Sequence, residues 1–222
     1  MLELKDIQYR PSTSEEPVLQ GVDLLAHASQ PVVIAGASGS GKTSLLEVIS
    51  GLASAQQGAI YWEHKPLNQR QLRWMCGVVF QFPERHFLGL TVAQELRLGH
   101  RRLTSVEQTQ ALQKVGLAQI DMKQAPERLS GGQQRRLALA VQLLRKPTIL
   151  LLDEPTAGLD WSVRDEVLEL LSKLAREQLL IVATHEPELF KEWQSTSYSL
   201  HDGQLRLMTK SHRIMRKECL ID

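Results

Sequence analysis

Cysteine is scarce in this chain of 222 residues, which contains only Cys76 and Cys219. Two isolated cysteines cannot build a disulfide framework, and they lack the spacing of a metal site. Cys76 stands in an apolar run, so we expect it to be a buried structural thiol. This cysteine usage favours a reducing compartment.

Long apolar runs are also missing. The longest uninterrupted ones, such as 149–152, are far shorter than the roughly 18 to 20 residues that a membrane-spanning helix needs. The first residues lack the charged and then apolar pattern of a signal peptide. We therefore expect a soluble chain, and any membrane process would need other subunits to supply the membrane part.

An excess of one charge is absent too, because 26 basic residues face 25 acidic ones. Proteins that coat nucleic acid usually carry a clear basic patch or stripe, so we expect no nucleic-acid partner. Local basic clusters occur at 97–102 and 210–217. Clusters of this kind are typical of solvated faces, and the second could also face a membrane.

Strand-like and helix-like patterns alternate along most of the chain, which indicates an α/β fold with a largely parallel sheet. The expected strands are an alternating start (Leu2, Leu4, Ile7), 31–35, 59–62, 77–80, 148–152, 179–183 and a hairpin over 198–207 that turns at Asp202-Gly203. The expected helical regions are 42–50, 92–117, 131–144 and 162–177.

The stretch from 83 to 146 carries helix signals only, so we interpret it as a helical subdomain inserted into the α/β core. The prediction is one domain over 1–222. Its core comprises 1–82 and 147–210, and 211–222 forms a basic tail.

A glycine-rich loop between an expected strand and an expected helix fits the phosphate-loop pattern G-x-x-x-x-G-K-[ST]. Its backbone amides and the helix amino terminus would face the phosphates, with Lys42 on the β- and γ-phosphates and Thr43 on Mg²⁺. The residues expected to bind nucleotide here are Gly36, Ala37, Ser38, Gly39, Ser40, Gly41, Lys42, Thr43 and Ser44. The alternative is a glycine-rich turn that matches this pattern by chance.

Two carboxylates follow the apolar run 149–152, at the end of a strand where open α/β sheets bind their ligands. Asp153 is placed to hold Mg²⁺ through water, and Glu154 to polarise the attacking water. The alternative is that these two acidic residues simply begin a turn.

The run Leu129-Ser-Gly-Gly-Gln133 precedes an expected helix. Ser130 is a suitable helix cap, and Gly131 and Gly132 would expose backbone amides to an anion. A bare cap would explain Ser130 but would require neither the two glycines nor Gln133.

With these motifs in this order, the chain resembles the ATP-binding subunits of ABC (ATP-binding cassette) proteins. The resemblance implies a P-loop NTPase, RecA-like core with an amino-terminal antiparallel β part, and ATP and Mg²⁺ as cofactors. It also implies roles for three isolated residues. Tyr9 would stack on adenine, Gln81 would contact Mg²⁺ and sense the γ-phosphate, and His185 would be the switch histidine.

Further roles follow from the same resemblance. The expected catalytic set is Lys42, Gln81, Glu154 and His185, and the expected metal set is Thr43, Gln81 and Asp153. Nucleotide contacts would extend to Ser130, Gly131, Gly132 and Gln133 of the signature motif and to Asp160 of the D-loop, 157–160. In this family the signature motif covers the nucleotide of a partner subunit. A second ABC ATPase subunit is therefore expected, in a homodimer or a heterodimer.

The segment 80–92 is similar to the corresponding region of energy-coupling-factor transporter ATPases, which serve the uptake of vitamins or transition metals. This similarity implies integral membrane transport subunits as partners and a peripheral place on the cytoplasmic face of a membrane. Phe82, Phe87 and Leu88, flanked by Glu84 and Arg85, would then form a contact patch. Packing inside the helical subdomain is the alternative for this patch.

Soluble ABC ATPases are the main alternative. Those of DNA repair carry long coiled-coil inserts, and those of translation carry two cassettes per chain. Neither feature occurs in this sequence. An iron–sulfur cluster assembly ATPase stays open as an alternative, although 133–136 resembles transporters more. A P-loop kinase would lack both the signature motif and the switch histidine.

Overall fold

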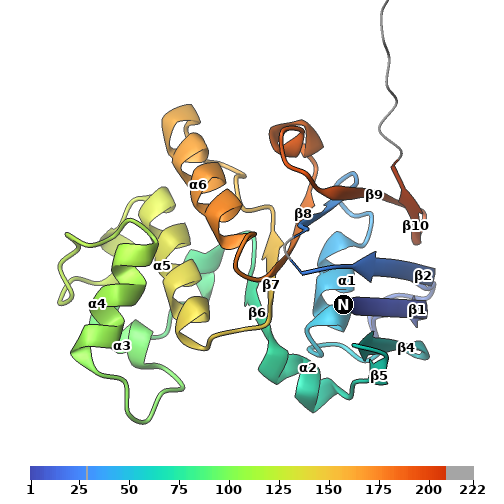
Figure 1. Ribbon diagram of the computed structural model, residues 1–222, viewed down its shortest axis with the longest axis horizontal. Coiled ribbons are helices and arrows are strands. Elements are labelled where there is room, and N and C mark those ends of the chain that lie inside the picture. Colours follow the sequence, from blue (N-terminus) through green and yellow to red (C-terminus); the bar gives the residue numbers. More distant parts are fainter. Residues whose placement is uncertain (29, 209–222) are drawn as a thin grey trace, which may run out of the picture.

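The computed structural model describes residues 1–28 and 30–208, which form two sheets with helices around them (Figure 1). The predicted basic tail and Cys219 lie outside the described residues. One sheet is antiparallel, in the order β2-β1-β4-β5. It comprises β1 (Leu2–Tyr9), β2 (Leu19–Ala26), β4 (Gln57–Trp62) and β5 (Lys65–Pro66).

The second sheet has the order β10-β9-β3-β8-β7-β6 and is parallel except for its last hairpin, β9-β10. Its strands are β3 (Val32–Ala35), β6 (Cys76–Val79), β7 (Ile149–Asp153), β8 (Leu179–Thr184), β9 (Thr196–His201) and β10 (Gln204–Leu207). The hairpin turns at Asp202-Gly203, where both residues have positive φ. The predicted α/β class, with its antiparallel amino-terminal part, is therefore confirmed.

The central strands are buried on both faces, so alternate side chains enter two different cores. Val32 and Ile34 of β3 pack with the antiparallel sheet and α1 (Lys42–Ile49), whereas Val33 packs on the opposite side. On that side lie α5 (Gly131–Leu144) and α6 (Trp161–Leu174). A strand between two apolar layers needs no polar face, which explains the uninterrupted apolar runs.

The amino-terminal strand does not alternate regularly. The pairing of β1 with β2 shifts register between Leu4 and Ile7, and Asp6 has a φ of 48°. This irregularity changes the phase by one residue, so that Ile7 instead of Asp6 faces the core.

Every residue from 83 to 146 is described, and none of them lies in a strand. The segment contains the 3₁₀ helices η1 (Pro83–His86) and η2 (Pro126–Arg128), together with α3 (Val92–Arg97), α4 (Ser105–Lys114) and α5. These helices lie beyond the β6 edge of the parallel sheet (Figure 1). The boundaries of the inserted subdomain remain a prediction.

Some expectations differ in detail from the structure. The region 92–117 is not continuous, because α3 ends at Arg97 and α4 begins at Ser105. The helix α2 (Gln69–Met75) is not among the predicted elements, although Asn68 and Gln71 form a capping box at its start. Another short 3₁₀ helix, η3 (Pro187–Phe190), follows β8. Burial raises the pKa of the Cys76 thiol to about 12, as suits a structural cysteine.

No helix of the described residues combines the length and the apolar character needed to cross a membrane.

Candidate ATP site

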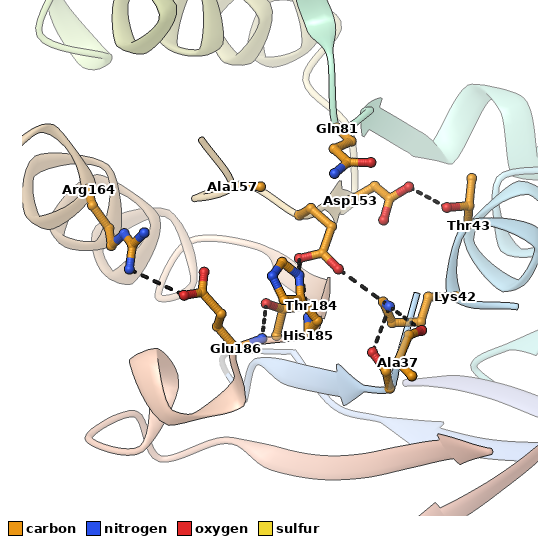
Figure 2. A network of polar contacts seen from close by, with 12 residues as sticks. Ala37, Lys42, Thr43, Gln81, Asp153, Ala157, Arg164, Thr184, His185 and Glu186 are labelled. Atoms are coloured by element: carbon orange, nitrogen blue, oxygen red, sulfur yellow. Dashed lines mark hydrogen bonds and ion pairs between the residues drawn. The ribbon is translucent and has the colours of Figure 1, made fainter. Parts of the chain in front are cut away.

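The phosphate loop connects β3 to α1 and wraps around the Lys42 ammonium group. Gly39 and Gly41 have φ values of 80° and 98°, a region that residues with a side chain rarely adopt. Lys42 is buried, and its Nζ donates to the carbonyl oxygens of Gly36 (2.8 Å) and Ala37 (3.0 Å) (Figure 2). The backbone conformation and the position of the lysine both require the loop to close tightly.

Two buried carboxylates at the end of β7 complete the centre. Thr43 Oγ1 donates to Asp153 Oδ2 at 2.6 Å, and Gln81 lies beside this pair (Figure 2). Glu154 is held at both carboxylate oxygens. Its Oε1 lies 3.4 Å from Lys42 Nζ, and its Oε2 lies 2.8 Å from His185 Nδ1 and accepts from the His185 backbone N–H at 3.2 Å. Parallel strands β7 and β8 therefore bring the residues from three distant motifs together.

The pKa of Asp153 is raised chiefly by burial, and the charge of Glu154 adds to the effect. The hydrogen bond from Thr43 and the charge of Lys42 act in the opposite direction. Burial and Asp153 likewise raise the pKa of Glu47 on α1. The centre thus crowds negative charge into a poorly hydrated place, which a bound cation would relieve.

A hollow of about 600 Å³ opens above these groups. Its lining residues are Val18, Ala37, Ser38, Gly39, Gly41, Lys42, Thr43, Ser44, Gln81, Asp153, Glu154 and His185. All but Val18 are expected from the sequence. Gly36 and Ser40, also expected from the sequence, are not among the lining residues and pack closely together, since a Cβ on Gly36 would lie 2.5 Å from Ser40 Oγ.

Tyr9 lies at the end of β1, half-buried against the core, and it is not among the lining residues. Tyr9 is connected to the hollow through Val18, a lining residue whose backbone N–H donates to the carbonyl oxygen of Tyr9 at 2.8 Å. No sequence signal distinguished Val18 from other apolar residues. The stacking role of Tyr9 remains a prediction.

The signature residues begin α5 and lie away from this hollow. Ser130 and Gln133 form a capping box, in which each side chain accepts from the backbone N–H of the other residue. Gly132 is needed for packing, because a Cβ there would lie 2.3 Å from Val163 Cγ1. Packing does not require a glycine at Gly131, since a Cβ there would enter open space. The structure of its own chain therefore does not explain Gly131.

Asp160 is exposed and precedes α6, but its side chain makes no capping bond. A different residue connects this loop to the centre. The guanidinium of Arg135 on α5 contacts the carbonyl oxygens of Gln81, Glu154 and Ala157. Arg135 is not among the predicted site residues, although it stands four residues before the buried Leu139 and hence on the core face of the helix.

The oxygen groups around Thr43 fit a magnesium ion. Mg²⁺ prefers hard oxygen ligands, often one or two carboxylates together with substrate phosphates. Thr43 Oγ1 and Asp153 Oδ2 are hydrogen-bonded to each other, and Gln81 lines the same hollow. The described residues hold no cluster of three or more His, Cys, Asp or Glu that could bind a metal without phosphate oxygens.

Comparison with known proteins decides the family. The model of the ABC transporter family matches residues 19–157. The chain belongs to the ABC transporter family. As an ABC ATPase it binds and hydrolyses ATP, and its core is a P-loop NTPase fold.

Two relatives illustrate the similarity. ABC transporter I family member 11, chloroplastic, of Arabidopsis thaliana is 40% identical over 201 residues, which cover 83% of this chain and 72% of the relative. The energy-coupling factor transporter ATP-binding protein EcfA2 of Streptococcus sanguinis is 34% identical over 219 residues, 91% of this chain and 78% of the relative.

Solved structures agree with this fold. CbiO1 from Clostridium perfringens, part of the ABC transporter complex CbiONQ, has a TM-score of 0.81 at 27% identity and covers 92% of this chain and 86% of that one. The dimeric ATP-binding cassette MJ0796, in a post-hydrolysis state bound to ADP and Pi, has a TM-score of 0.79 at 28% identity. The match covers 94% of this chain and 98% of that one.

Replacing Asp153 by asparagine is expected to stabilise the nucleotide-free chain at neutral pH. The raised pKa means that folding disfavours the ionised carboxylate. This penalty is absent below the pKa of an unfolded aspartate, about 3.9, and is complete above the pKa in the folded chain. Thermal melts should show a higher Tm for Asp153→Asn than for wild type at pH 7.5. This difference in Tm should become smaller as the pH falls toward 4.

Asp165→Asn on the exposed side of α6 is the matched control and should leave the Tm unchanged. A lower Tm for Asp153→Asn at pH 7.5 would show that the Thr43 and Lys42 contacts outweigh the desolvation of this carboxylate.

Proposed function

We propose that this chain is the ATP-hydrolysing subunit of an energy-coupling-factor-type transporter that takes up a vitamin or a metal ion through separate membrane subunits. The observation that carries this proposal is an apolar loop directly after Gln81. Phe82, Leu88 and Leu90 are 43%, 80% and 79% exposed there. The EcfA2 relatives and the similarity of 80–92 to energy-coupling-factor ATPases support the same assignment.

At the ATP site we assign the roles as follows. Lys42 and the amides of the phosphate loop hold the β- and γ-phosphates, while Glu154 orients and polarises the attacking water. Thr43, Asp153 and Gln81 hold Mg²⁺, which neutralises charge on the phosphates when it is bound. His185 fixes the direction of the Glu154 carboxylate through the contact of 2.8 Å.

The partner subunit follows from the signature residues. They lie outside the hollow of their own chain, and Gly131 faces open space. A second ABC ATPase subunit placed against α5 would bring its nucleotide to the exposed amino terminus of this helix, where backbone N–H groups attract phosphate. We propose such a dimer, either of two identical chains or of this chain with a similar one.

The docking loop, residues 82–90, has a defined shape. The buried Glu95 carboxylate accepts from the backbone N–H groups of Leu88 (2.9 Å) and Gly89 (2.7 Å). Arg85 stacks over the Phe82 ring at 4.6 Å. Phe87, expected in the exposed patch, is half-buried against the core of the helical segment. An exposed apolar loop held in one conformation is a suitable contact for another protein.

A larger hollow lies near the docking loop, between α2, α4 and the end of α5. Arg145, which lines it, donates to the side chain of Gln142 (3.2 Å), which lines a smaller hollow with Pro83 and Phe87. Trp74 is 73% exposed at its edge. We propose that a segment of the membrane subunit occupies this groove and that the chain lies on the cytoplasmic face of the membrane.

Changing Glu84 and Arg85 together to alanine is expected to weaken binding of the membrane subunit at least about 10-fold, because a few residues near the centre of an interface contribute most of its binding energy, more than about 1 kcal/mol each. Folding and ATP binding should persist, since neither residue lines the ATP hollow. Pull-down of the membrane subunit, a thermal melt and a nucleotide-binding assay together test this.

The chain offers a matched control. Glu127 and Arg128 follow a proline in η2 as Glu84 and Arg85 do in η1, and both are exposed. Alanine at Glu127 and Arg128 should leave partner binding intact. Equal binding by both double variants would contradict the docking assignment and favour the soluble alternative, an iron–sulfur cluster assembly ATPase.

A further inference from the structure

Arg135 connects three segments of the ATP site that are far apart in the sequence. It is 5% exposed. Its Nη2 donates to the carbonyl oxygen of Gln81 (2.8 Å), and its Nη1 donates to those of Glu154 (3.0 Å) and Ala157 (3.2 Å). Gln81 begins the connection to the docking loop, Glu154 directly follows β7, and Ala157 leads into α6. One side chain of the helical segment thus holds three backbone positions of the core.

This arrangement is costly for the folded chain. Burial lowers the pKa of the guanidinium, and the charges of Glu84 and Glu154 oppose this effect. Within the described residues Arg135 has no ion pair within 4 Å, and its buried Nε has no hydrogen-bond partner. A buried cation without an ion pair contributes little to stability compared with an apolar residue of similar size. Packing alone therefore does not account for an arginine at this position.

The backbone of Glu154 shows what the guanidinium holds. Its φ of 47° lies in the left-handed region, which is unfavourable for a residue with a side chain. Such a conformation persists only where the surroundings impose it. Here the N–H of Glu154 donates to Ala183 of β8, and its carbonyl oxygen accepts from Arg135. The direction of the Glu154 side chain depends on both contacts.

We propose that Arg135 is a positioning residue for ATP hydrolysis, which fixes Glu154 and the 154–157 turn relative to Gln81 and transmits movement of the docking loop to them. The second part rests on the proposed function. The docking loop begins one residue after the carbonyl group that Arg135 binds, and Glu84 is close enough for its charge to act on the guanidinium. A membrane subunit that displaces this loop would therefore shift a hydrogen bond that the guanidinium shares with Glu154.

The test compares Arg135→Gln and Arg135→Lys with wild type in basal ATPase activity, nucleotide affinity and thermal melting. Glutamine has too few donors for three carbonyl groups, and lysine keeps the charge without the planar fork. We expect kcat to fall at least about 10-fold in Arg135→Gln and less in Arg135→Lys, with KM and nucleotide Kd within about 3-fold of wild type. Arg164→Gln is the control, because the buried Nε of Arg164 also lacks a hydrogen-bond partner, but its guanidinium pairs with Glu186 at 3.4 Å and does not line the ATP hollow. It should keep kcat within about 2-fold.

An unchanged kcat in a folded Arg135→Gln chain, or a higher KM at unchanged kcat, would overturn the proposal. If Arg135→Gln does not fold, Arg135→Lys decides in the same way. Failure of both variants to fold would assign Arg135 to structure alone and would also overturn the proposal.

Stimulation of ATPase activity by the membrane subunit separates the role of Arg135 from the proposed function. A wild-type chain that is not stimulated contradicts the proposed function, while the basal comparison still decides the role of Arg135. Full stimulation of Arg135→Gln would overturn the transmission.

Discussion

Replacing Glu154 by glutamine is expected to lower ATP turnover at least about 100-fold while ATP binding is retained, because general-base contributions are of this size. Glutamine has the same shape but cannot accept a proton from water or attract it as strongly. Binding should persist, since the phosphate loop and Lys42 are unchanged and the contact from Lys42 Nζ to Glu154 Oε1, at 3.4 Å, is long. Phosphate release and equilibrium binding of a fluorescent ATP analogue measure the two properties.

Glu186→Gln is the matched control for this experiment. Glu186 follows His185 directly and pairs with Arg164 at 3.4 Å, but it does not line the hollow (Figure 2). Its turnover should remain close to wild type. Near-normal hydrolysis by Glu154→Gln would exclude Glu154 as the group that activates water.

The second large effect concerns sites shared between two chains. A Lys42→Ala chain loses the phosphate contact of its own site, and a Gly131→Asp chain should block the site of its partner. In a mixed dimer both defects fall on one composite site and the other stays intact. Each variant alone should be nearly inactive. In a 1:1 mixture whose chains exchange freely, about half of the dimers are mixed and each of these has one intact site, so roughly a quarter of all sites should be active.

The choice of Gly131 matters for this test. A side chain on Gly132 would collide with Val163 of its own chain, so Gly132→Asp would also disturb folding. A side chain on Gly131 would enter open space, so Gly131→Asp should leave the monomer intact. No recovery in mixtures shown to contain mixed dimers would contradict a shared site. If the natural partner is a similar but different chain, the complementary variant is made in that chain.

Much of the site was predictable because its motifs place consecutive residues. The helix 131–144 and its Ser130 cap agree with the structure, since a capping box is a local signal. The phosphate loop and the two carboxylates at the end of β7, those of Asp153 and Glu154, also lie together as expected. These features depend on short-range geometry and on the rule that parallel strands end at one edge of a sheet.

The residues that sequence reasoning missed depend on long-range packing. Val18 reaches the hollow only because β1 and β2 pair in an antiparallel register next to the phosphate loop. The contacts of Arg135 join residues that are 19, 22 and 54 positions apart in the chain. The phase change at Asp6 likewise comes from the register of two strands, which alternation alone does not reveal.

The native mass of a captured complex tests the central claim most directly, namely that ATP is bound and hydrolysed between two cassette chains coupled to a membrane subunit. The tagged Glu154→Gln chain is isolated from detergent-solubilised membranes with ATP and Mg²⁺, and its mass and nucleotide content are measured. The account predicts two cassette chains, this one of 25.0 kDa among them, two retained ATP molecules and the membrane subunits. A single cassette chain that retains ATP, without a second cassette or a membrane subunit, would contradict it.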